Sequence, residues 1–64
     1  MWRATWMEQR GSGPWTERSR RLTNEEAGRL SRSGAHDDDF MDVARAVLGL
    51  PEGAHISGLA LHQE

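Results

Sequence analysis

Cysteine is absent from this 64-residue sequence, which excludes disulfides, thiolate metal sites and a cysteine nucleophile. Its absence is also typical of proteins from a reducing compartment. Lysine is missing too, and all eight basic residues are arginine. No apolar run is long enough to cross a bilayer, and charge follows Met1 too early for a signal peptide. We therefore expect a cytoplasmic protein without a membrane-spanning segment.

Length and charge indicate how many domains the chain forms and how its charge is distributed. A chain of 64 residues makes one small domain, near the lower limit at which a core without disulfides folds alone. Residues 1–32 hold seven arginines and four glutamates, a net charge of +3. Residues 33–64 hold one arginine and six carboxylates, a net charge of −5. The folded protein should be electrically dipolar unless the two halves interleave.

The clearest structural pattern is that of residues 37–50, DDDFMDVARAVLGL, which predicts an amphipathic helix. One arc of the helical wheel is apolar and holds Phe40, Val43, Ala44, Val47 and Leu48. The opposite side holds Asp38, Asp39, Asp42, Arg45 and Ala46. Asp37 is a suitable N-cap, and the sequence from Gly49 to Pro51 predicts the end of the helix.

Residues 1–22 have the pattern of a β-hairpin. Trp2, Ala4 and Trp6 alternate with other residues, which predicts a strand whose tryptophan face is buried. The turn cluster RGSGP follows at residues 10–14. The returning segment, 15–22, is so polar that it suits an edge strand or an exposed sheet face.

A short helix is predicted within residues 23–34, from about Asn24 to Ser33. Thr23 and Glu26 have the spacing of a capping box, in which each side chain accepts the other residue's backbone N–H.

The last segment, 54–63, has two interpretations. The spacing of Ile56, Leu59 and Ala60 fits a helix, whereas a β-bulge at Gly58 would fit a strand. We favour the strand, because two strands need a third to be stable. The predicted fold is therefore a single α+β domain of order β-β-α-α-β, with a three-stranded antiparallel sheet and helices packed on one face.

The acidic run supplies the first candidate site, which consists of Asp37, Asp38, Asp39 and Asp42. At a rise of about 1.5 Å per residue, Asp38 and Asp42 lie about 6 Å apart along the helix. This separation is comparable to that of successive phosphates in a nucleic-acid strand. Such a face can occupy a basic groove meant for nucleic acid. The simpler interpretation is an N-terminal cap with a solvated surface.

A second candidate, for nucleic-acid binding, consists of Trp15, Arg18, Arg20 and Arg21. Arginine pairs with phosphates, and an exposed indole stacks on bases. On a strand, however, Arg18 and Arg20 would share one side while Trp15 lies on the other. A hairpin edge kept soluble by arginine is the simpler interpretation, and we expect no direct nucleic-acid binding.

No pattern predicts a metal, a cofactor or catalysis. His36 and the aspartates after it lack the alternating spacing of a calcium loop, and His55 and His62 lack a zinc pattern. The sequence GSG at residues 11–13 lacks the lysine and helix of a phosphate loop. A core built from so few residues leaves little for a concave catalytic pocket. We expect a protein that is not an enzyme.

A general resemblance to one group of proteins rests on three segments, MWRATWMEQ, GPWTERSRRLTNEEAGRL and DDDFMDVARAVLGL. Together they resemble the small, cysteine-free inhibitors encoded by phages and mobile elements, anti-CRISPR proteins among them. The resemblance implies no catalysis, and binding of an acidic surface to a host protein or protein–RNA complex with a basic surface. The alternatives are a nucleic-acid-binding or regulatory protein that uses the arginine-rich hairpin, and an accessory subunit stabilised by homodimerisation.

Overall fold

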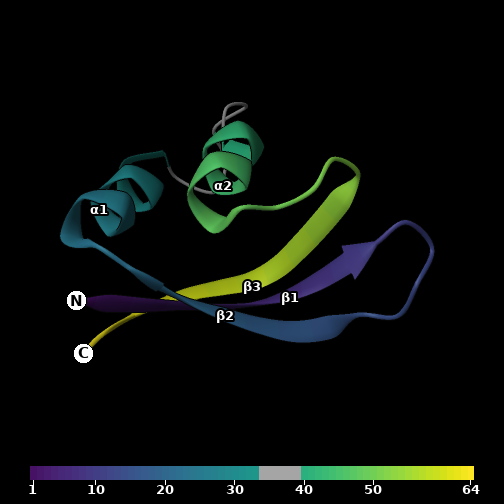
Figure 1. Ribbon diagram of the computed structural model, residues 1–64, viewed down its shortest axis with the longest axis horizontal. Coiled ribbons are helices and arrows are strands. Elements are labelled where there is room, and N and C mark those ends of the chain that lie inside the picture. The colour runs from purple at the N-terminus through teal and green to yellow at the C-terminus, as the bar shows by residue number, and fades with distance from the viewer. Residues whose placement is uncertain (34–39) are drawn as a thin grey trace.

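The computed structural model describes residues 1–33 and 40–64. The elements in chain order are β1 (Trp2–Arg10), β2 (Thr16–Leu22), α1 (Asn24–Ser33), α2 (Phe40–Leu48) and β3 (Ala54–Gln63). The strands form one antiparallel sheet in the order β2-β1-β3, with β1 in the centre. Both helices lie on one side of the sheet, and the chain ends meet at one end of it (Figure 1). The predicted α+β fold and the predicted order of elements are confirmed.

The central strand β1 has one buried side and one open side. Ala4 and Trp6 are buried beneath the helices, and Trp2 packs against the same core. Met7 lies on the opposite side and is 37% exposed. The alternation predicted from the sequence is therefore confirmed, because successive side chains of a strand point to opposite faces.

Strand β3 contains the predicted bulge. Its register with β1 shifts between Thr5 and Met7, where β3 contributes one extra residue. Gly58 has a φ of +63°, a left-handed conformation that glycine adopts without a steric penalty. The extra residue brings both Ile56 and Leu59 against the core. The strand with a bulge is confirmed, and the helical alternative for this segment is wrong.

Helix α1 begins with the predicted capping box. The backbone N–H of Thr23 donates to Glu26 Oε1 at 2.9 Å, and the N–H of Glu26 donates to Thr23 Oγ1 at 3.1 Å. The hydrogen bond from the Thr23 N–H is the largest cause that lowers the pKa of Glu26 below its ordinary value of 4.5. Ala27 and Leu30 are buried on the inner side of the helix.

Helix α2 buries its apolar arc as predicted, since Ala44, Val47 and Leu48 are buried and Phe40 and Val43 pack partly buried against the core. This contact with the sheet and α1 supplies much of the hydrophobic stabilisation.

The end of α2 also follows the sequence. Gly49 has a φ of +70°, and the N–H groups of Gly49 and Leu50 both donate to the carbonyl of Arg45, at 2.9 and 3.1 Å. These bonds satisfy a carbonyl that the helix leaves unpaired, and Leu50 folds back into the core. The proposed N-cap, Asp37, lies outside the described residues.

Candidate functional site

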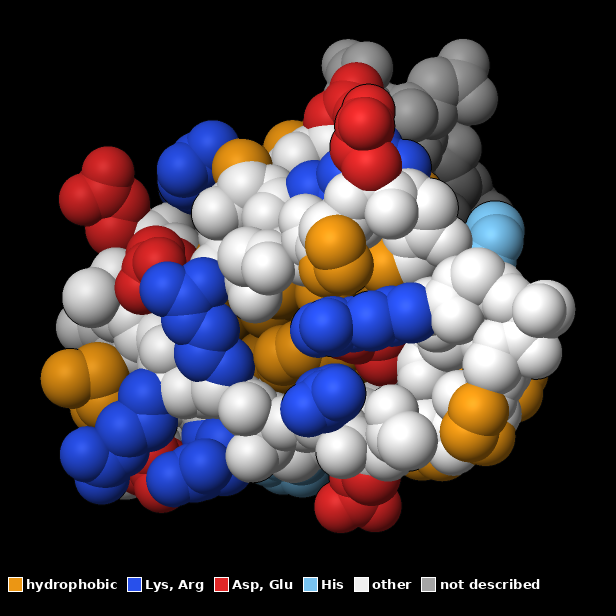
Figure 2. All heavy atoms as spheres, turned by 45° about the vertical axis from the view of Figure 1, so that its right-hand side comes forward, with side chains coloured by type: hydrophobic (Ala, Val, Ile, Leu, Met, Phe, Trp, Pro, Cys, Tyr) orange, Lys and Arg blue, Asp and Glu red, His pale blue; other side chains and the backbone are white. Residues whose placement is uncertain are grey.

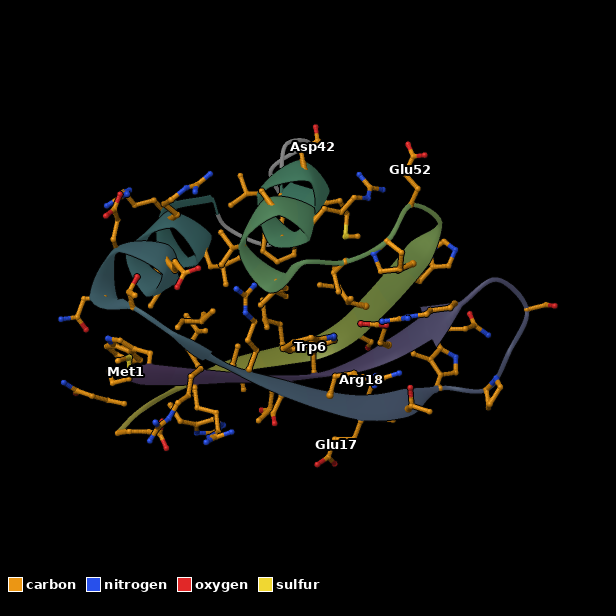
Figure 3. The ribbon with its side chains drawn as sticks, viewed as in Figure 1. Met1, Trp6, Glu17, Arg18, Asp42 and Glu52 are labelled. Carbon is orange, nitrogen blue, oxygen red and sulfur yellow. The ribbon has the colours of Figure 1, made fainter. Side chains whose placement is uncertain are left out.

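The polar side of α2 is turned away from the sheet, and Asp42 is the described member of the predicted acidic site. Figure 3 shows Asp42 on the outer side of the helix. Its side chain is 76% exposed, and its Oδ1 accepts a hydrogen bond from Arg45 Nη1 at 3.1 Å. An exposed ion pair contributes only about 0–1 kcal/mol. Asp42 can therefore exchange Arg45 for a cation of a partner at little cost.

The other three predicted members, Asp37, Asp38 and Asp39, lie outside the described residues. In the sequence they directly precede Phe40, the first residue of α2.

Cross-strand pairing decides on which side of the sheet each arginine of β2 lies. Arg18 faces Trp6 and Arg20 faces Ala4, so both arginines lie on the helix-bearing side. Arg21 lies on the opposite side, because neighbouring residues of a strand alternate. The three arginines therefore do not form one cationic surface.

Arg20 connects the edge strand to both helices. Its Nη1 donates to the carbonyl oxygen of Val47 near the end of α2, and its Nη2 lies 4.0 Å from Glu26 Oε2 in α1. A cation at a helix C-terminus is favourable, because the last carbonyls lack partners and carry the negative end of the dipole. The guanidinium of Arg20 thus has a structural role.

Arg21 and Arg3 share one carboxylate on the open side of the sheet. Their Nε atoms lie 3.2 Å and 3.4 Å from the two side-chain oxygens of Glu64. Desolvation alone would raise the pKa of Glu64. The charge of Arg3 and the hydrogen bonds of both arginines outweigh it and hold that pKa below 4.5. Arg21 is therefore paired with Glu64, although this ion pair, like that of Asp42, is largely exposed.

Trp15 comes just before β2 and is 45% exposed, as base stacking would require. Arg21 follows six residues later, which corresponds to about 20 Å of extended chain at roughly 3.3 Å per residue. The structure does not bring Trp15, Arg18, Arg20 and Arg21 together into one nucleic-acid site.

One buried carboxylate, Glu8, is not among the residues singled out from the sequence. Glu8 of β1 is 1% exposed and accepts hydrogen bonds from Trp6 Nε1, at 3.1 Å, and from Arg10 Nε. Burial would raise the pKa of Glu8. The hydrogen bonds of Arg10 and Trp6 and the charges of Arg10 and Arg18 outweigh burial and lower the pKa below 4.5. On this side of the molecule arginine side chains lie across an apolar hollow, and part of a carboxylate is visible beneath them (Figure 2).

The signal for Glu8 was present in the alternation of β1. Glu8 continues the series Trp2, Ala4 and Trp6, so the same period of two places it on the buried side. Arg10 is the next member of that series and supplies the counter-charge that a buried carboxylate requires.

A shallow hollow of about 200 Å³ is lined by Thr5, Trp6, Met7, Glu17 and Gly58. Figure 3 shows Glu17 on the side of the sheet away from the helices. The hollow is smaller than ligand pockets, which measure about 300–1,000 Å³. Its lining offers one titratable group, whereas acid–base catalysis needs several that converge.

Among the described residues, no group of three histidine, cysteine, aspartate or glutamate side chains is placed to hold a metal ion. His62 Nε2 instead lies 3.4 Å from Thr5 Oγ1, and His36 lies outside the described residues. No helix in the described part of the chain is long and apolar enough to cross a membrane.

Fold and surfaces together define a small α+β domain whose three-stranded sheet is covered on one side by two helices. Comparison with protein-family models, curated proteins and solved structures finds no match.

Proposed function

We propose that this chain is a non-enzymatic protein-binding module. It presents the acidic face formed by Asp37, Asp38, Asp39 and Asp42 to a basic surface of a host protein or protein–RNA complex. More specifically, the proposed module is an anti-CRISPR-like inhibitor that covers a nucleic-acid-binding site of this host protein or complex. The observation that carries the proposal is the 76% exposure of Asp42 on the outer side of α2. Carboxylates can substitute for phosphates here, because arginine binds both through paired hydrogen bonds.

The packing of α2 supports this role. Val47 and Leu48 anchor the helix in the core, and Arg20 binds the Val47 carbonyl at its end. The outer residues are thus carried by a helix whose position is determined by contacts on its inner side. Substitution of Asp42 should change the charge of the surface without removing a core contact.

The arginine contacts favour an acidic binding surface over the arginine-rich one. Arg20 binds Val47 and lies near Glu26, and Arg21 binds Glu64. A phosphate would have to replace these contacts on two sides of the sheet. We therefore expect no salt-sensitive binding of oligonucleotides to the purified protein, even at low salt, where phosphate contacts are strongest.

The first step of the test identifies the partner. The immobilised protein captures its partner from host lysate that has been treated with nuclease or left untreated. We expect a protein component to be retained in both samples. Two results together would support nucleic-acid binding by the arginine-rich hairpin instead. The partner would be lost after nuclease treatment, and the protein would bind oligonucleotides until Arg18, Arg20 and Arg21 are replaced together.

The second step isolates the acidic charge. The triple variant D38N/D39N/D42N keeps side-chain size and removes three charges, so it should lower the association rate and the salt dependence of binding to the purified partner. The control E17Q/E25Q removes two exposed carboxylates, one in β2 and one in α1, and should bind more tightly than the first variant. Thermal melting checks that both variants fold. A folded aspartate variant that binds like the wild type at low salt would contradict the proposal.

A further inference from the structure

The two edges of the sheet differ in charge. The β2 segment Thr16–Leu22 contains three arginines and one glutamate, whereas Ala54–Gln63 of β3 contains no Asp, Glu, Lys or Arg. Both are edge strands, so within the described part of the chain no strand pairs with their outer backbone groups. Charged side chains protect an edge from pairing with another strand, and a long uncharged edge lacks this protection.

Apolar side chains at β3 would gain from a neighbouring strand. Ile56, Leu59 and Leu61 pack against the core but stay only partly buried. A strand added beside β3 would cover part of their exposed surface, and burial of apolar area is favourable. A 64-residue chain gains much from such burial, because small domains bury a low fraction of their surface.

We infer that β3 is a homodimerisation edge. The β3 strands of two copies pair antiparallel about a two-fold axis, which gives a six-stranded sheet with all helices on the same side. A two-fold axis places the same surface of both copies in contact, so an edge used in this way must not repel itself. β3 meets this condition, whereas β2 would bring arginines of two copies together. The bulge at Gly58 leaves a run of β3 on either side for pairing.

The inference is tested by the molecular mass in solution, measured by sedimentation from micromolar to millimolar concentration. We expect the wild-type mass to rise with concentration from 7.2 kDa to twice that value. The variant Ser57→Lys adds one charge to each β3 edge and should raise the dimer Kd about tenfold or more, since like charges across a ladder are unfavourable. Ser19→Lys is the matched control, because it adds the same charge to an exposed position of β2. It should leave the Kd unchanged.

Hydrogen exchange of the wild type gives an independent measurement that does not require a variant to fold. Amides of β3 should exchange more slowly at high concentration than at low concentration, while those of β2 should not change. A wild type that stays monomeric at millimolar concentration would overturn the inference. A dimer that dissociates in the Ser19→Lys variant but persists in a folded Ser57→Lys variant would also overturn it. So would a dimer whose β3 amides gain no protection from exchange.

Discussion

Replacement of Glu8 by Gln tests the account of the buried carboxylate. The amide has nearly the same size and its oxygen can still accept from Trp6 Nε1, but the charged hydrogen bond with Arg10 is lost. Hydrogen bonds to charged groups contribute about 1.5–3 kcal/mol. We expect a loss near the lower end, about 1.5–2 kcal/mol, because the Arg10 side chain is 57% exposed and water can solvate its guanidinium. Thermal melting should then show a decrease in Tm on the order of 10 °C for a chain of this size.

The same variant predicts a pH dependence with a definite sign. The folded-state pKa of Glu8 lies below its ordinary value of 4.5, so its stabilisation is present above pH 4.5. This stabilisation is lost as the pH falls from 4.5 through the lower pKa that Glu8 has in the folded protein. The difference in unfolding free energy between the wild type and Glu8→Gln should therefore shrink on acidification. Glu26 and Glu64 also have lowered pKa values, but both proteins retain them, so their effects cancel in the difference.

Denaturant unfolding at a series of pH values from 7 down to about 3 measures this difference, a range that spans the ordinary glutamate pKa. Glu17→Gln is the control, because Glu17 is exposed on the other side of the sheet and its loss should change stability little. A difference that stays constant across this pH range, or a Glu8→Gln variant as stable as the wild type at pH 7, would refute the account.

Two further predictions concern the backbone. Thr23→Ala should lower stability by about 1 kcal/mol, because the Glu26 N–H loses its acceptor at the start of α1; an unchanged melting temperature would contradict this cap. Gly58→Ala should cost about 1–2 kcal/mol from its left-handed φ alone, since an added Cβ would meet no atom within 4 Å. Gly28→Ala in α1 is the matched control and should be neutral or stabilising in the same melting experiment, because alanine is a better helix former and the φ of Gly28 is not positive.

Much of the fold could be predicted from local sequence. The capping box needs only Thr23 and Glu26, three residues apart, and the end of α2 needs only Gly49 and the turn after it. Periodicity identified the buried side of β1, because its period of two follows from strand geometry alone. The strand assignment of β3 required one further argument, namely that a hairpin needs a third strand to be stable.

The candidate sites could be predicted less well. The sequence indicated which residues are charged, but not which of those charges are already paired. Arg21 lies 43 residues from its partner Glu64, and Arg20 lies 27 residues from the Val47 carbonyl. Such pairs depend on the packing of distant segments. By contrast, Asp42 pairs with Arg45 of the same helix, three residues away in the sequence.

The sequence by itself determined where the helices and strands lie, since capping, turns and hydrophobic periodicity act between residues close in the chain. Only the tertiary structure decided that β1 is the central strand, that Arg20 and Arg21 bind partners in distant segments, and that β3 forms an edge. The physical reason is that burial, counter-charge and strand neighbours are properties of the assembled layers. No segment contains this information before the others pack against it.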